Sequence, residues 1–94
     1  MPSSSTSLQA AKAAGYFDSL CRHFARKVAV ERDGDHARVR FPMGDCLMSL
    51  EGQQMHVQCI ADDGQALETL KSIVAAHALR FAEWRNARLT WTHR

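Results

Sequence analysis

Between residues 28 and 60, apolar and polar residues alternate in four short runs that are separated by turn-forming residues. A period of two is typical of strands that have one buried and one exposed face. The Asp33-Gly34 pair predicts a two-residue hairpin turn, and residues 42–45 and 51–54 predict two further turns. Because the four runs agree in parity, they predict an antiparallel meander with one apolar face.

Segments with a helical period flank these strands. Thr6 and Gln9 stand at the spacing of a capping box, so we expect a helix to begin near Ser7 and residues 1–6 to form a flexible tail. A second helix is expected to begin after residues 62–64, because their acidic side chains suit the N-terminus of a helix.

Together these elements predict an α+β fold in which residues 7–94 form a single domain. The expected architecture is a two-layer sandwich of helix, four-stranded antiparallel meander and helix, with both helices on one face of the sheet. We expect the second helix to stop near Asn86 and residues 89–92 to form a short extended segment. With 94 residues, the chain is too short for a TIM barrel or a complete dinucleotide-binding fold.

Composition and charge exclude several functional classes. A formal net charge of +2 is too small for bulk nucleic-acid binding, which uses strongly basic surfaces. No run of the sequence approaches the ~18 apolar residues needed to span a membrane, and the Ser-rich start does not resemble a secretory signal. Three cysteines without the spacing of a disulfide scaffold fit a reducing compartment. We therefore predict a cytoplasmic protein with free thiols.

Two cysteines are predicted to lie opposite each other on the apolar face. If the third hairpin is symmetric about residues 51–54, Cys46 pairs with Cys59. Cys21 and His23, near the end of the first helix, could join them in a zinc or redox cluster. We favour a packing role, because the chain has no Cys-x-x-Cys motif and free cysteines are commonly buried.

The opposite face of the predicted sheet is basic. In the inferred register, Lys27 neighbours Arg40, and Arg38 and His56 lie on the same face. Guanidinium groups suit carboxylates and phosphates, and an imidazole can tune binding near neutral pH, so this face is a candidate site for an anionic ligand. Acidic neighbours such as Glu31 could instead neutralise the charge and leave an ordinary solvated surface.

Two histidines lie at the edges of the apolar helical stripes. His23 and His77 could point into one groove between the helices. A histidine in such a position is more often a packed side chain with one hydrogen bond than a metal ligand or a base. The tryptophans Trp84 and Trp91 are likewise expected to cap the core. No catalytic constellation is recognisable, and no cofactor is expected.

Several separated blocks of the sequence resemble one family of small bacterial domains, the domain of unknown function numbered 2218. This resemblance covers nearly the whole chain. It implies a role in ferric-siderophore handling, because the members of this family look like domains that occur either alone or fused to siderophore-interacting flavoproteins. Family members often have a second histidine where this chain has Arg26, which weakens a histidine-based metal role here. The sheet-and-two-helix pattern also looks like the fold of the TATA-binding protein. The blocks are LCRHFARK (20–27), FPMGDC (41–46), HALRF (77–81) and LTWT (89–92).

Two functional hypotheses follow. The first is a non-enzymatic accessory or binding domain whose basic sheet face engages an anionic small molecule, such as an iron chelate, or a siderophore-reductase partner. The same face could also form a homodimer, with Leu47 and Ile60 as apolar anchors. The second hypothesis is a small metal- or thiol-dependent enzyme that uses Cys46, Cys59 and His23. We favour the first, because it requires only a surface.

Overall fold

The computed structural model describes residues 2–93. Two helices, a short 3-10 helix and a sheet of six strands make up the fold. The elements follow one another in the order β1 (Ser3–Gln9), α1 (Ala13–Ala25), β2 (Ala29–Asp33), β3 (His36–Phe41), β4 (Gly44–Glu51), β5 (Gln54–Ala61), α2 (Gly64–Ala78), η1 (Ala82–Trp84) and β6 (Thr92–His93).

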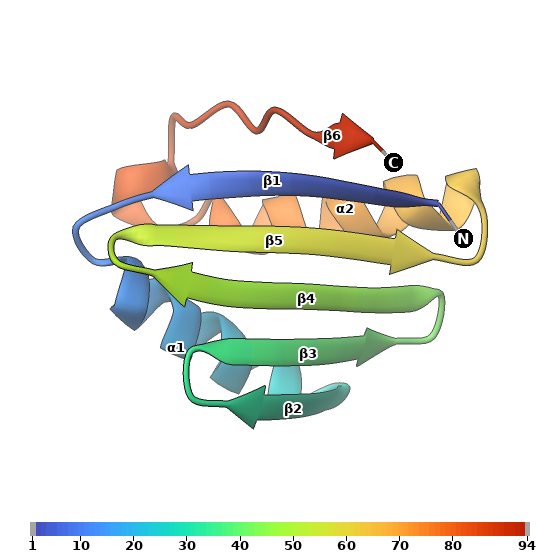
Figure 1. Cartoon of the computed structure of the whole chain (residues 1–94), viewed down its shortest axis with the longest axis horizontal. Helices are drawn as coiled ribbons and strands as arrows, with labels where there is room; N and C mark the ends of the chain where they lie inside the picture. Colours follow the sequence, from blue (N-terminus) through green and yellow to red (C-terminus); the bar gives the residue numbers. More distant parts are fainter. Residues whose placement is uncertain (1, 94) are drawn as a thin grey trace.

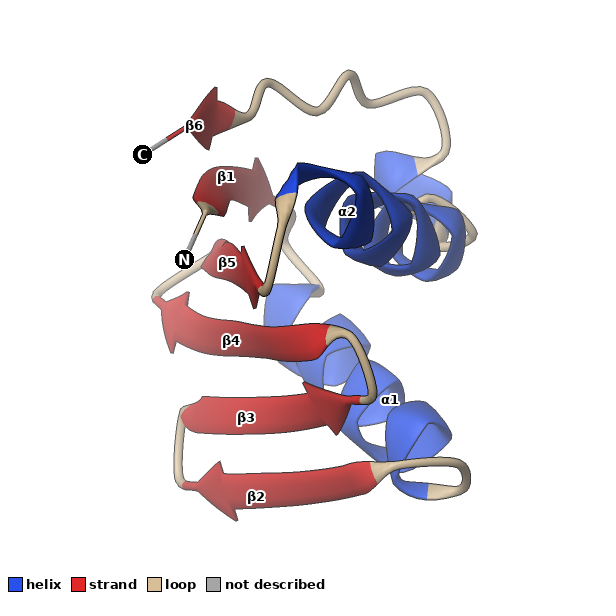
Figure 2. Ribbon diagram, turned by 90° about the vertical axis from the view of Figure 1, so that its right-hand side faces the viewer, coloured by secondary structure: helices blue, strands red, loops and turns tan. Residues whose placement is uncertain are grey.

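The sheet is antiparallel throughout, with the spatial order β2-β3-β4-β5-β1-β6 (Figure 1). Both helices cover the same face of this sheet, and the other face is left open (Figure 2). The α+β class and the placement of the helices are as predicted. A sheet of only four strands was wrong, because the two ends of the chain add β1 and β6.

The first strand is the largest departure from the predicted organisation. Residues 1–6, expected to be a tail, include most of β1, and all seven of its residues pair with β5. Ser4, Thr6 and Leu8 are buried under the helices, so β1 has the alternation of a half-buried strand. Two of these inward positions carry hydroxyl side chains, so the sequence shows no clear alternation of apolar and polar residues there.

The first helix therefore begins at Ala13 rather than near Ser7, and its start is capped from a distant segment. The two carboxylate oxygens of Glu83 accept hydrogen bonds from the backbone N–H groups of Ala11 and Lys12, each at 2.9 Å. The hydrogen bond from Lys12 is the main reason why the pKa of Glu83 is lowered. This contact satisfies amide groups at the start of α1 that have no partner within the helix.

The first hairpin turn is displaced by one residue from its predicted position. Asp33 pairs with His36, so the turn residues are Gly34 and Asp35, with Gly34 at φ +59°. Glycine with positive φ at the first central position is typical of a type II′ turn, which joins strands tightly. As a result, the predicted pairing of Lys27 with Arg40 is wrong.

The core lies between the helices and the inner face of the sheet. Its largest fully buried side chains come from the helical layer and from the middle strands, and they include Trp84, Phe17, Leu20, Met48 and Met55. The predicted register of the third hairpin is confirmed, because Cys46 pairs with Cys59 and Met48 with Val57. This hairpin anchors the apolar layer on which both helices pack.

The C-terminal part of the chain also differs from its prediction. Helix α2 ends at Ala78 rather than near Asn86. The following turn buries Trp84, whose indole Nε1–H donates a hydrogen bond to the Gln9 carbonyl at 3.1 Å. The chain then returns along β1, where Ser5 pairs with Thr92. Within residues 2–93, neither helix has the length and apolar character required to cross a bilayer.

Candidate ligand-binding site

The open face of the sheet carries polar side chains in regular cross-strand rows. Because directly paired residues of an antiparallel sheet point to the same side, the pairings define which side chains are neighbours. One row joins five strands and contains two histidines, two serines and an aspartate; its members are Ser7, His56, Ser49, His36 and Asp33. The adjacent row runs through Ser5, Gln58, Leu47, Arg38 and Glu31.

These two rows border a hollow on the open face, which we call the sheet hollow. Its volume is about 530 Å³, and residues of both rows line it. The volume falls within the range of roughly 300–1,000 Å³ that is usual for small-molecule sites. The lining offers hydroxyl, imidazole, amide, carboxylate and guanidinium groups around the half-exposed side chain of Leu47. A polar ligand with a short apolar part matches this composition.

His56 is held in place from two sides. The hydroxyl of Ser7 lies 2.7 Å from His56 Nδ1, and the carboxylate of Glu51 lies 3.6 Å from His56 Nε2. A ring proton on Nε2 would face Glu51 and leave Nδ1 to accept the hydrogen bond of the Ser7 hydroxyl. The imidazole is therefore oriented by its neighbours, with its plane fixed beside the sheet hollow.

The arginines of this face are paired with carboxylates. Arg38 Nη2 lies 2.7 Å from Asp45 Oδ2, and Arg38 Nε donates to the same oxygen at 2.9 Å. Arg40 Nε lies 3.3 Å from the carboxylate of Glu31. Arg38 lines the sheet hollow and Arg40 does not. The predicted basic lattice is thus largely neutralised.

Lys27 lies elsewhere. It follows helix α1, and its backbone N–H donates to the Phe24 carbonyl at 3.0 Å. Its ammonium group is one of the charges that lower the pKa of His23. Of the predicted ligand-binding residues, Arg38 and His56 line the hollow, whereas Lys27 joins a different group of side chains.

The contribution of β1 to this site was not predicted from the sequence. Ser5 and Ser7 line the hollow because β1 is an inner strand of the sheet, whereas a tail or the start of a helix was expected at these positions. The alternation of Ser4, Thr6 and Leu8 with the outward residues was the available signal. It was weak because only one of these inward side chains is strongly apolar.

The thiols belong to the core. Cys46 and Cys59 have no exposed surface, and Cys21 lies on the buried face of α1. The hydrogen bond with Cys59, together with burial, raises the pKa of Cys46 well above its usual value. Within residues 2–93, no three His, Cys, Asp or Glu side chains are arranged to hold a metal ion. All three thiols therefore lie in the packed core of the domain.

His23 does not reach the thiols but contacts His77, so the two histidines meet between the helices as the sequence suggested. Their ring centroids are 4.6 Å apart. The Nδ1 atom of His77 lies 2.7 Å from the Ile73 carbonyl oxygen, to which it donates a hydrogen bond. Burial is the main cause that lowers the pKa of His23, and the neighbouring His77 and basic side chains lower it further.

Fold and site together define a small α+β domain whose open antiparallel sheet face carries a polar hollow. The chain belongs to the bacterial family described as "Uncharacterized protein conserved in bacteria (DUF2218)", whose model matches residues 5–92.

A search of curated proteins gives no match. Among solved structures, the fold is similar to the NMR structure of PA4090 from Pseudomonas aeruginosa. The two chains are 23% identical, with a TM-score of 0.77, and the match covers 100% of this chain and 96% of the other. At this identity, the similarity concerns the fold alone.

Proposed function

We propose that this protein is a ligand-binding domain that holds a small polar molecule with an anionic group in the sheet hollow. The observation that carries this proposal is the hollow of about 530 Å³ on the face that no helix covers. Arg38 supplies a positive charge on the open face at this site, whereas Arg32, which also lines the hollow, is paired with Asp18 of α1. The row of serines and histidines supplies hydrogen-bonding groups.

Pairing with Asp45 suits Arg38 for this role. A guanidinium group has five N–H donors, and the contacts with Asp45 involve Nε and Nη2. The remaining donors stay available, because the Arg38 side chain is 46% exposed. The carboxylate of Asp45 holds the guanidinium plane in position, which reduces the entropy that is lost when a ligand binds.

We extend the proposal to the ligand class. The family resemblance suggests ferric-siderophore handling, and a chelate with free carboxylates would present the anionic and hydroxyl groups that the hollow can bind. In this proposal the domain acts without catalysis, as an accessory that presents the chelate to a siderophore reductase. Homodimerisation through Leu47 and Ile60 would cover the same face, so it would compete with the ligand.

The enzyme alternative gains no support from a specific observation. It would use Cys46 and Cys59, which have no exposed surface, and His23, which packs against His77 instead. A substrate could reach the two thiols only after the helices had separated from the sheet. We therefore do not carry this alternative further.

The direct test is an NMR titration of the ¹⁵N-labelled protein with gallium(III) citrate, a diamagnetic substitute for a ferric carboxylate chelate. We expect saturable shifts at the amides of the two rows that border the hollow. Arg38→Ala should weaken binding by roughly ten- to hundredfold, because a hydrogen bond to an ionised group contributes roughly 1.5–3 kcal/mol.

Arg88→Ala is the matched control, because Arg88 is exposed and does not line the hollow. Its affinity should equal that of the unaltered protein. If Arg38→Ala and Arg88→Ala bound the chelate equally well, the hollow would be excluded as the site. Concentration-dependent shifts of the same amides without ligand would indicate a dimer on this face instead.

A further inference from the structure

The last turns of the two helices bring together a second group of basic side chains. His23 of α1 and His77 of α2 stand at its centre, with ring centroids 4.6 Å apart. The positive charges around His23 that lower its pKa come from both helical segments. We call this group the helix-end cluster, and its members are Arg22, His23, Arg26, Lys27, His77 and Arg80.

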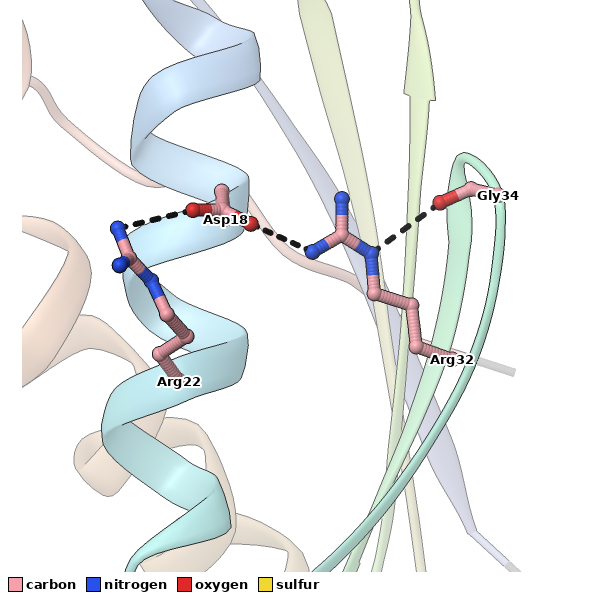
Figure 3. Close-up of polar contacts among 4 residues, drawn as sticks. All are labelled: Asp18, Arg22, Arg32 and Gly34. Carbon is pink, nitrogen blue, oxygen red and sulfur yellow. Dashed lines mark hydrogen bonds and ion pairs between the residues drawn. The ribbon is translucent and has the colours of Figure 1, made fainter.

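Carboxylates are scarce around the helix-end cluster. Arg22 pairs with Asp18 at 2.9 Å, but Asp18 also binds Arg32 of β2 at 2.6 Å (Figure 3). Arg32 is held further by a hydrogen bond to the Gly34 carbonyl at 3.3 Å. The one carboxylate that pairs with the cluster is therefore shared with an arginine outside it.

The remaining cations of the cluster have no acidic partner in the described chain. Between residues 2 and 93, no carboxylate lies within 4.0 Å of the charged nitrogens of Arg26, Lys27 or Arg80. Like charges held close together repel one another, and this cost is lowered when an anion binds between them. Positive charge without a partner thus distinguishes this region from the sheet face.

A hollow of about 320 Å³ lies on α1 beside this charge. Its lining consists of Ser19, Arg22, His23 and Arg26, which are spaced three and four residues apart and therefore share one face of the helix. This face directs a hydroxyl, two guanidinium groups and an imidazole toward one volume. Arginine forks and a hydroxyl donor are the groups that bind phosphate oxygens in proteins.

The pair His23 and His77 should make anion binding in this hollow depend on pH. The hydrogen bond from Nδ1 to the Ile73 carbonyl fixes the orientation of the His77 ring beside His23. The charged groups that act on His23 are Arg26 and Lys27 on the side of α1, and His77 and Arg80 on the side of α2. All of them are cationic or neutral, so a bound dianion would favour protonation of His23.

From the hollow and the unpaired cations, we infer that the helix-end cluster is a second binding site, specific for a phosphate group, with Arg22, Arg26 and Ser19 as the principal donors. It is independent of the sheet hollow and needs no part of the function proposed above. The ligand is a free phosphate, a soluble phosphate ester or a phospholipid headgroup, which share this chemistry.

Helix-end cations have another general role, because they interact favourably with the negative end of the helix dipole. That role predicts variants that lose stability equally in every buffer. A phosphate site predicts stabilisation that appears only when phosphate is present and that increases with its concentration. The two explanations therefore differ in a measurable quantity.

The test is a titration with inorganic phosphate, compared with sodium chloride at matched ionic strength. In ¹⁵N NMR spectra we expect saturable, phosphate-specific shifts at residues 19–27, and an upward shift of the His23 pKa when phosphate is bound. Arg26→Gln should weaken phosphate binding about tenfold. The matched control Arg88→Gln, at an exposed position that lines neither hollow, should leave phosphate binding at residues 19–27 unchanged.

Two further arms identify the source of the phosphate. Binding to glycerol phosphate with no co-sedimentation on phosphatidic acid vesicles supports a soluble ligand. Co-sedimentation that needs phosphatidic acid in a phosphatidylcholine vesicle, and that Arg26→Gln abolishes, supports a lipid headgroup. The inference is overturned if phosphate and chloride cause the same shifts and vesicles do not bind, or if Arg26→Gln binds phosphate as well as the control.

Discussion

The sheet hollow and the helix-end cluster both contain arginines and histidines, yet their electrostatic character differs. On the sheet, Arg38 and Arg40 each lie beside a carboxylate, contributed by Asp45 and Glu31 respectively. In the helix-end cluster, Arg26, Lys27 and Arg80 have no such partner within residues 2–93. The number of basic residues in a region therefore says little about its charge until the neighbouring acids have been placed.

The pairing of strands explains how the arginines of the sheet come to lie beside carboxylates. An antiparallel sheet fixes which side chains stand opposite or diagonal to one another, so Asp45, which pairs directly with Arg40, also reaches Arg38. The exposed helix positions of the cluster have neighbours only three and four residues away, and Asp18 is the one acid in α1. A ligand in the sheet hollow would thus contact a guanidinium that Asp45 orients. A ligand at the helix-end cluster would contact positive charges that have no carboxylate partner.

The largest predicted effect concerns the scaffold that the two regions share. Met48 is 1% exposed and lies on the inner face of β4, directly after Leu47 of the hollow. Met48→Ala should lower the free energy of unfolding by ~2–5 kcal/mol, because it leaves a cavity in the core. Urea denaturation measures this change.

The neighbouring substitution Leu47→Ala is the control for that experiment. Leu47 is half-buried on the open face, so its loss should cost clearly less than the loss of Met48. Equal losses for the two variants would mean that the open face is itself buried in solution, as in a dimer, and the comparison of two exposed regions would no longer hold.

A smaller effect is expected when the carboxylate of the sheet pair is removed. Asp45→Asn removes the negative charge beside Arg38 but keeps an amide oxygen that can accept a hydrogen bond from its guanidinium, so the sheet face then resembles the helix-end cluster in charge. Exposed ion pairs contribute roughly 0.2–1 kcal/mol, so anion binding at the hollow should strengthen by up to about fivefold at low salt and lose this gain at high salt. Phosphate titration monitored at the hollow amides checks this result.

The control for charge alone is Asp62→Asn, which makes the same change in net charge at an exposed position between β5 and α2. It should leave anion binding at the hollow almost unchanged. The idea that pairing distinguishes the two regions fails if Asp45→Asn and Asp62→Asn have the same effect on the hollow.

The smallest predicted effect is a change in the pH dependence of stability. The pKa of Glu83 is lowered from 4.5 by its hydrogen bonds to the start of α1, so its contribution to stability is present above that value. This contribution is lost as the pH falls through the lowered pKa. Glu83→Gln should therefore flatten the acid limb of the stability curve below about pH 4.5.

His23 acts in a separate pH window. Its pKa is lowered from 6.5 in the folded protein, so the unfolded chain binds the proton more readily and stability falls as the pH drops below about 6.5. His23→Gln should remove that part of the decline, and phosphate should reduce it in the unaltered protein. Thermal denaturation of both proteins between pH 5 and 8 measures this effect, and the same pH dependence of the two melting temperatures would show that His23 does not contribute.

The alternation of apolar and polar residues predicted the strands between residues 28 and 60 and part of their register. Cys46 and Cys59 were correctly paired, because the turn with Gly52 is centred between the two strands. The same argument failed at the first hairpin, where the Asp33-Gly34 pair suggested the wrong central residues. Glycine occupies the first central position in both turns, and this rule would have given the correct register.

Other features depend on contacts between distant residues. Strand β1 pairs with β5, about fifty positions away in the chain, and its inward serine and threonine gave no apolar pattern. The cap that Glu83 places on α1 spans 71 residues. The hydroxyl groups of the hollow and the pairing of its arginines could not be predicted without these contacts, whereas Arg38 and His56 were placed correctly on the open face.

The map of amide shifts caused by gallium(III) citrate in the unaltered protein tests the proposed function most directly. Shifts concentrated at the two rows that border the sheet hollow, in β1, β2, β3, β4 and β5, are the predicted result. Shifts concentrated at residues 19–27, around the end of α1, would contradict it, because the ligand would then bind at the unpaired charges rather than in the sheet hollow.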